Sequence, residues 1–105
     1  PAIAAAAGDK LTVMFDSGIR RGSDAVVALC LGAKYVFVGR ATLYGAAAGG
    51  TTGAVRALDI FKDEIGRTMM QMGAPGIRSL GPQFLTWDSD DLRRNSPPSG
   101  VMRRA

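Results

Sequence analysis

Two short apolar runs constrain the fold of this chain more than any other feature. Leu11–Phe15 and Tyr35–Val38 are almost continuously apolar, which is the pattern of strands buried on both faces of a parallel sheet. The segment between them, residues 24–31, is predicted to be a helix that Ser23 caps and Gly32 ends. The order strand, helix, strand predicts a parallel crossover unit of the α/β class.

Further helices are predicted on both sides of this unit. Pro1–Ala7 is rich in alanine and has a high helix propensity. After the second strand come a short segment at Leu43–Ala48 and a long helix at Thr52–Met72, which Gly73 ends. Residues 77–87 are expected to be an ordered but irregular extension. One face of the long helix is predicted to be core, because its apolar positions recur every three or four residues: Val55, Leu58, Phe61, Ile65, Met69 and Met72.

The basic charge of the chain is confined to its end. Among the 105 residues, positions 1–92 hold nine Lys or Arg and nine Asp or Glu, so the net charge of +4 comes from the arginines beyond them. These arginines lie among Ser, Pro, Gly and Asn residues, a composition typical of unstructured ends. We therefore expect a folded portion over 1–91 and a disordered basic tail over 92–105. Since the tail is not a basic face, no nucleic-acid partner is expected.

The cysteine and histidine content excludes several kinds of site. Cys30 is the only cysteine, so the chain has no internal disulfide, and its apolar neighbours predict that it is buried. The chain has no histidine, which argues against a metal site and a Ser-His triad. No leader-like segment opens the sequence, and no apolar run approaches the roughly 18 residues of a spanning helix. We expect a soluble, cytoplasmic chain.

Glycine and arginine follow both predicted strands. Asp16, Ser17, Gly18, Ile19 and Arg20 come after the first, and Gly39 and Arg40 come after the second. Glycine lets backbone N–H groups approach a phosphate closely, and a guanidinium adds paired, charged hydrogen bonds. In a (β/α)8 barrel the last two βα loops and a short extra helix often bind phosphate. One such pair would be an ordinary loop, but two at successive strand ends favour a phosphate site.

The sequence motifs of these loops also resemble those of a known protein family. Asp-Ser-Gly-Ile-Arg-Arg-Gly-Ser-Asp at 16–24, Leu-Gly-Ala at 31–33 and Gly-Arg-Ala-Thr-Leu-Tyr-Gly at 39–45 are similar to the FMN-dependent 2-hydroxy-acid oxidases and dehydrogenases. In the family, the usual sequence of the first motif is Asp-Gly-Gly-x-Arg-x-Gly-x-Asp. Ser17 departs from it, and in this respect the chain is most similar to the mandelate dehydrogenases. The resemblance covers about residues 1–87.

The resemblance implies a fold and a cofactor. It implies that residues 1–91 are the C-terminal part of a TIM (β/α)8 barrel, comprising its last two βα units and a C-terminal extension. It also implies that Asp16, Ser17, Gly18, Ile19, Arg20, Gly39 and Arg40 contact the phosphate and ribityl chain of FMN.

The resemblance implies an activity that this chain cannot complete. The parent enzyme would oxidise a 2-hydroxy acid, mandelate-like, to the 2-oxo acid, using a histidine in an upstream His-Gly-Gly-Arg-type segment. The chain would then be an inactive fragment without catalytic residues, whose partner is the missing N-terminal part of the barrel. A homo-oligomer is also implied, as is association with the inner face of the membrane through a segment outside this chain.

Two other interpretations fit the same residues less well. Barrels similar to IMP dehydrogenase or to type 2 isopentenyl-diphosphate isomerase have comparable glycine-rich motifs, but the segment 39–45 matches them poorly. A non-catalytic remnant or interaction module is the alternative from a different functional class.

Overall fold

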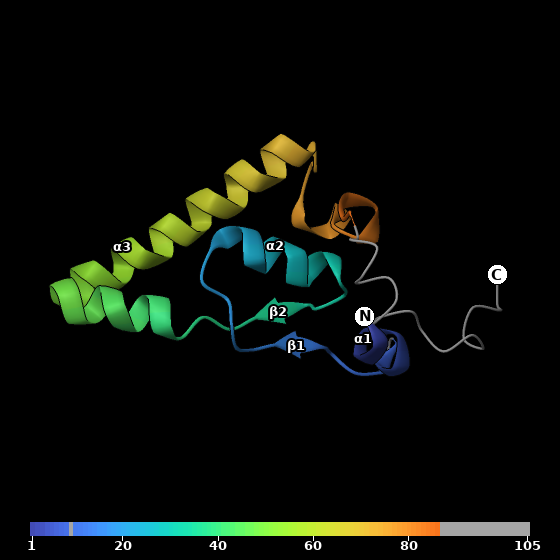
Figure 1. The fold of residues 1–105 in the computed structure, drawn as a ribbon, viewed down its shortest axis with the longest axis horizontal. Helices are drawn as coiled ribbons and strands as arrows, with labels where there is room; N and C mark the ends of the chain where they lie inside the picture. The colour runs from blue at the N-terminus through green and yellow to red at the C-terminus, as the bar shows by residue number, and fades with distance from the viewer. Residues whose placement is uncertain (9, 87–105) are drawn as a thin grey trace.

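The computed structural model describes residues 1–8 and 10–86. The expected tail at 92–105 and the end of the 1–91 portion lie outside this range. Along the chain the elements are helix α1 (Ala2–Ala7), strand β1 (Met14–Phe15), helix α2 (Gly22–Cys30), strand β2 (Tyr35–Val36), helix α3 (Arg40–Met72) and the short 3-10 helices η1 (Ile77–Ser79) and η2 (Pro82–Phe84). Figure 1 shows α2 lying between the strand pair and the long second part of α3.

The predicted strand, helix, strand unit is confirmed. β1 and β2 pair in parallel, with Met14 opposite Tyr35 and Phe15 opposite Val36. Phe37 N–H donates to the Phe15 carbonyl oxygen at 2.9 Å and extends the ladder past β2. Both strands run towards the same side, the left-hand side in Figure 1, where the chain turns into α2 and α3. The ends of the two strands therefore share one edge.

The strands are shorter and more exposed than the sequence predicts. Each has only two residues, within the expected ranges Leu11–Phe15 and Tyr35–Val38. Met14 is 56% exposed and Tyr35 is 62% exposed, so burial on both faces is wrong for the described residues. The physical reason is that each strand has a single neighbour, and that α2 covers one face of the pair.

Helix α2 begins two residues earlier than predicted, and Ser23 does not cap it. Arg21 is the N-cap residue, and Asp24 reaches back from the first turn. Its Oδ2 accepts hydrogen bonds from the backbone N–H groups of Arg20 and Arg21, both at 2.9 Å. A carboxylate that accepts two bonds replaces the single bond expected from the serine hydroxyl. At the other end Gly32 has φ +104°, consistent with its predicted role as a stop.

The two helices predicted at Leu43–Ala48 and Thr52–Met72 form one element with a sharp kink. Helix α3 is non-helical at Gly49 and Gly50, and Gly50 has φ +59°. Glycine adopts this conformation without a Cβ penalty, which explains a kink at this point. The kink divides α3 into a first arm, residues 40–48, and a second arm, residues 51–72.

The core lies between α2 and the second arm of α3. Val26 and Cys30 of α2 are each 1% exposed, and the burial predicted for Cys30 is confirmed. The predicted apolar face of the long helix is only partly covered: Phe61 is 7% exposed, but Val55 is 52% and Leu58 is 53% exposed. The main cluster consists of Ile19, Ala25, Ala28, Ala33 and Phe61.

Candidate functional site

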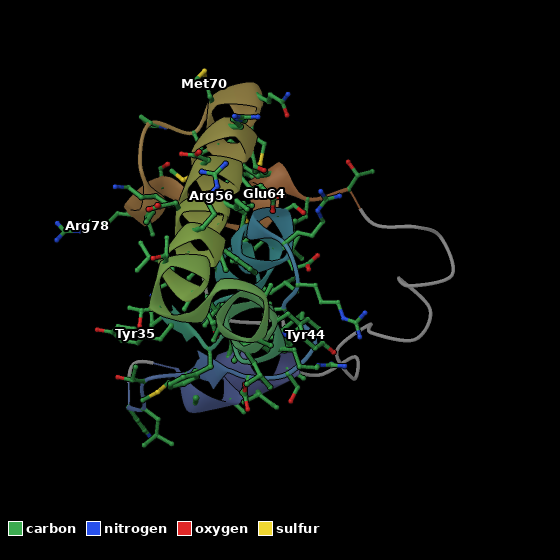
Figure 2. All side chains as sticks on the ribbon, turned by 90° about the vertical axis from the view of Figure 1, so that its left-hand side faces the viewer. Tyr35, Tyr44, Arg56, Glu64, Met70 and Arg78 are labelled. Carbon is green, nitrogen blue, oxygen red and sulfur yellow. The ribbon has the colours of Figure 1, made fainter. Side chains whose placement is uncertain are left out.

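The strand ends bring both predicted anion-binding segments to one edge of the sheet. The first loop, residues 16–21, leaves β1, and the second loop, residues 37–39, leaves the neighbouring strand β2. Figure 1 shows the first loop and the start of α3 on the same side of the strand pair. Figure 2 looks at the molecule from that side. All the predicted site residues therefore lie on these two loops or at the first residue of α3.

The first loop makes an unusual turn at its exposed tip. Ser17 has φ +78° and Gly18 has φ +82°, and Ser17 is the only residue other than glycine with a positive φ in the described part of the chain. The left-handed conformation costs an L-residue roughly 1–2 kcal/mol. Among the described residues, the N–H groups of Ser17, Gly18 and Ile19 donate no hydrogen bond. The loop therefore presents consecutive free backbone donors in a strained turn, as functional loops often do.

Ile19 fixes this turn to the core. Its side chain is 7% exposed and belongs to the buried cluster that includes Phe61 of α3. The side chain is therefore an anchor, and only the backbone of Ile19 remains available to a ligand. Ile19 was predicted as a site residue from its position in the motif. The sequence did not show that its side chain packs in the core while its backbone remains available to a ligand.

Carboxylates already occupy the N-terminus of α2. Asp24 accepts from the N–H groups of Arg20 and Arg21, and Glu64 Oε2 accepts from Gly22 N–H at 2.7 Å. A helix N-terminus attracts anions through its free amides and its dipole. Here the N–H groups of Arg20, Arg21 and Gly22 donate to carboxylates, and two negative charges lie at this end of the helix. An external phosphate is therefore expected at the turn before α2 and not at α2 itself.

Glu64 is the site residue that sequence reasoning missed. It lies 42 positions from Gly22, on the second arm of α3. In the sequence, Glu64 is only a residue next to the polar face of a predicted long helix. That position does not indicate a contact with a distant loop.

Two arginines at this edge are free of ion pairs. Arg20 and Arg40 are both exposed, and neither pairs with a carboxylate in the described part of the chain. Arg21 differs, because its Nη2 lies 3.3 Å from Glu64 Oε1. Arg20 and Arg40 therefore remain available to neutralise a bound anion.

The start of α3 supplies a second set of backbone donors. Gly39 is the N-cap residue, and no side chain caps this helix. Thr42 Oγ1 donates to the Gly39 carbonyl at 2.8 Å, and Leu43 N–H donates to the same oxygen at 3.1 Å. The N–H groups of the first turn have no acceptor within the helix and carry a partial positive charge. A Cβ on Gly39 would have nothing within 4 Å, so the approach to these donors is open.

A glycine crossing fixes the first arm of α3. A Cβ on Gly45 would lie 2.5 Å from the Gly53 carbonyl oxygen, and a Cβ on Gly53 would overlap the Gly45 carbonyl oxygen. The two arms can pack this closely only because neither residue has a side chain. The crossing sets the direction of the first arm and hence the position of Arg40.

A cavity of about 540 Å³ lies away from this edge. Among its lining residues, Thr12 and Lys34 come just before β1 and β2, and Ile77 and Arg78 belong to η1. The cavity is therefore near the opposite ends of the strands. The residues that the structure describes include no group of three or more His, Cys, Asp or Glu side chains able to hold a metal ion.

The two loops together suit a phosphate with two negative charges. Within residues 1–8 and 10–86, they offer amides at 17–19 that donate no hydrogen bond, a helix N-terminus at Gly39 and two guanidinium groups without an ion-pair partner. Such groups bind and orient an anion in a pocket of backbone donors. They supply hydrogen-bond donors and positive charge, which are the groups that bind an anion and neutralise it.

Known proteins are similar to this chain over most of its length. A family model described as FMN-dependent dehydrogenase matches residues 1–87. The (S)-mandelate dehydrogenase of Pseudomonas putida is 56% identical over 73 residues, which are 70% of this chain and 19% of the relative. Pre-mycofactocin synthase of Mycobacterium tuberculosis is 41% identical over 99 residues, which are 94% of this chain and 25% of the relative. The chain thus spans only about a fifth to a quarter of these relatives.

The fold is also shared with solved structures. A soluble mutant of the membrane-associated (S)-mandelate dehydrogenase from Pseudomonas putida matches with a TM-score of 0.76 and 49% identity, over 81% of this chain and 25% of that one. The structural neighbours are FMN-dependent TIM-barrel enzymes, so the strands and helices seen here are part of that fold. Within residues 1–8 and 10–86, no helix combines the length and the apolarity that crossing a membrane requires.

Proposed function

Because the chain belongs to the FMN-dependent dehydrogenase family, we propose that it forms the FMN-phosphate-binding part of a flavoenzyme. The whole enzyme would oxidise a 2-hydroxy acid, mandelate-like, to the 2-oxo acid. The observation that carries this proposal is the pair of adjacent strand ends. Each presents backbone N–H groups and an arginine that have no partner among the residues the structure describes. The identity to (S)-mandelate dehydrogenase supports the substrate class.

Each predicted site residue has a separate task in this proposal. The backbone N–H groups of Ser17, Gly18 and Ile19 would donate to phosphate oxygens, and Arg20 and Arg40 would neutralise the charge. These residues would hold FMN, which when bound would supply the two-electron acceptor for oxidation of the substrate.

Two further residues complete the set. Gly39 would admit the phosphate to the first turn of α3, since no atom occupies the space in front of it. Asp16 is an exposed carboxylate that only accepts hydrogen bonds, so it suits the ribityl hydroxyl groups better than the phosphate.

We assign the chain to the last two βα units of the barrel and its C-terminal extension. β1 with α2 and β2 with α3 would be the two units, and η1 with η2 the start of the extension. The first arm of α3 would then be the short extra helix that completes phosphate sites in such barrels. The exposed side chains of Met14 and Tyr35 would then contact the missing N-terminal part of the barrel.

The remaining parts of the active site would lie outside this chain. The chain has no histidine, so the base that the family resemblance implies would come from the missing part. The chain alone is therefore expected to be inactive. Localisation at the inner face of the membrane, through a segment elsewhere in the enzyme, and assembly into a homo-oligomer belong to the same proposal.

Cofactor identification tests the first half of the proposal. The intact parent enzyme is purified, its cofactor is released by heat, and the released flavin is identified. FMN is the expected result. Recovery of FAD, or of no flavin from folded enzyme, would reject the assignment. An enzyme that holds FMN but oxidises neither (S)-mandelate nor any other 2-hydroxy acid would leave the cofactor site standing and reject the substrate class.

The fragment assignment has its own test. The pure 105-residue chain is expected to show no flavin-dependent oxidation of mandelate, and addition of the separately produced upstream part is expected to restore turnover. Turnover by the chain alone would show that the base is not a histidine from the missing part.

A further inference from the structure

Glu64 connects the second arm of α3 to the end of the first loop. Its Oε2 accepts from Gly22 N–H at 2.7 Å, and its Oε1 lies 3.3 Å from Arg21 Nη2. The Glu64 side chain is 27% exposed and that of Arg21 is 74% exposed. In Figure 2, Glu64 lies where α3 faces the beginning of α2. One carboxylate thus holds two consecutive residues directly after the phosphate-binding turn.

The contact depends on very close packing of the two helices. A Cβ on Gly22 would lie 2.6 Å from Glu64 Cβ and from the Ile65 backbone nitrogen, and 2.8 Å from the Phe61 carbonyl oxygen. Gly22 N–H is in the first turn of α2 and has no acceptor within that helix. Glu64 provides this acceptor in a partly buried position, where a hydrogen bond to a charged group is worth more than one in water.

Glu64 also separates the roles of two adjacent arginines. Arg21 is drawn towards α3 by the ion pair, whereas Arg20 has no ion-pair partner in the described chain. Glu64 and Asp24 together place two carboxylates at the N-terminus of α2. The positive potential at this edge is therefore left to the first loop and to the start of α3.

We propose that Glu64 is a positioning residue for the FMN phosphate, and this inference rests on the proposed function. α3 carries Arg40 at its first residue and Glu64 on its second arm, and the crossing of Gly45 and Gly53 fixes the two arms relative to each other. By binding Gly22 and Arg21, Glu64 ties the first loop to the same helix. The two halves of the phosphate site are then held at a fixed separation through α3.

The test compares two flavins in the intact parent enzyme. Apoenzyme is titrated with FMN and with riboflavin, which has the same ring and ribityl chain but no phosphate, and binding is followed by flavin fluorescence. The variants are Glu64→Ala, Glu64→Gln and the control Asp63→Asn. Asp63 is an exposed neighbour on the same helix, and the control removes the same charge.

Loss of the positioning contact should act only on the phosphate. Glu64→Ala is expected to weaken FMN binding about tenfold while riboflavin binding changes less than about twofold. Glu64→Gln keeps an acceptor for Gly22 N–H but loses the pair with Arg21, so about a threefold loss is expected for FMN alone. Asp63→Asn should change neither. A merely structural role would weaken both flavins alike.

Unchanged FMN affinity in both Glu64 variants, or an equal loss for the two flavins, would overturn the inference. If Glu64→Ala does not fold, Glu64→Gln decides, and an unchanged ratio of the two affinities rejects the role. Wild-type enzyme that does not distinguish FMN from riboflavin would instead reject the phosphate site itself. The failure of the inference and the failure of the proposed function therefore give different results.

Discussion

The two loops at the strand ends use the same residue types but are held in different ways. The first is strained at Ser17, with φ +78°, and depends on contacts from distant residues, namely Ile19 in the core and Glu64 on α3. The second passes through Gly39, at φ −105°, directly into a helix. Its main support is the Thr42 hydroxyl, three residues further on, which donates to the Gly39 carbonyl oxygen. Tertiary packing therefore shapes the first loop, whereas local helix geometry shapes the second.

Because the two loops are supported differently, substitutions in them should affect protein stability and ligand affinity to different extents. Changes at the supports of the first loop should disturb folding as well as affinity, because Ile19 is a core residue and Glu64 joins α3 to the start of α2. Changes in the second loop should alter affinity and leave folding intact.

The largest effect is expected for a pair of glycine substitutions in the intact parent. Gly22→Ala would place a Cβ 2.6 Å from the Ile65 backbone nitrogen, so α2 and α3 must separate. We expect a loss of about 3 kcal/mol in the free energy of unfolding, measured by urea denaturation, and loss of FMN binding. Gly39→Ala, where a Cβ meets nothing within 4 Å, should cost less than about 1 kcal/mol but still weaken FMN binding. Equal losses of stability would contradict the comparison.

Removal of Arg40 should produce the next largest effect, on affinity alone. A charge-assisted hydrogen bond contributes roughly 1.5–3 kcal/mol, so Arg40→Ala should weaken FMN binding about ten- to a hundredfold. Saturating FMN should restore most of kcat, and Arg40→Lys should be intermediate, because lysine keeps the charge and loses the planar pair of donors. The measurements are FMN affinity and kcat at saturating flavin. Unchanged affinity, or a kcat that stays low at saturation, would show that Arg40 does not bind the phosphate.

A smaller difference in FMN affinity is expected between variants of Arg20 and Arg21, the adjacent arginines of the first loop. Arg20→Ala should weaken FMN binding about as much as Arg40→Ala, since Arg20 has no ion-pair partner among the described residues. Arg21→Ala should weaken it by about threefold or less, because Arg21 pairs with Glu64 and is 74% exposed. FMN titration of the three apoenzymes measures this difference. The reverse order would assign the phosphate to Arg21.

The smallest effect is expected at the strained turn. Ser17→Gly removes the cost of a positive φ and adds conformational freedom to the unfolded chain, so a net gain of about 0.5 kcal/mol in stability is expected. FMN affinity should stay within about twofold, since the backbone N–H remains. Thermal unfolding and FMN titration measure the two quantities. A large loss of affinity would indicate that the serine hydroxyl contacts the ligand.

Local sequence patterns predicted the features that depend on neighbouring residues. The strand, helix, strand order and the helix ends at Gly32 and Gly73 were predicted correctly, and both glycines have positive φ. The burial of Cys30 followed from its apolar neighbours. The cap of α2 was predicted at Ser23 because a hydroxyl at that position is common, but the Asp24 carboxylate accepts two backbone bonds and fixes the helix start instead.

Features that depend on distant contacts could not be predicted in the same way. Glu64 reaches Gly22 across 42 positions, and no local pattern indicates that contact. The exposure of Val55 and Leu58 depends on which elements pack against α3, and helix periodicity alone does not specify them. The site residues themselves were predicted from their types and their positions after two strands, and their ligand contacts stay a prediction.

The most direct test of the central claim is the ratio of FMN affinity to riboflavin affinity in the intact parent apoenzyme. If the first loop and the start of α3 bind the phosphate, FMN should bind at least about 100-fold more tightly than riboflavin. The double variant Arg20→Ala/Arg40→Ala should bring this ratio close to one, mainly by weakening FMN binding. Equal affinities for the two flavins in the wild-type enzyme, or a ratio that the double variant leaves unchanged, would contradict the account.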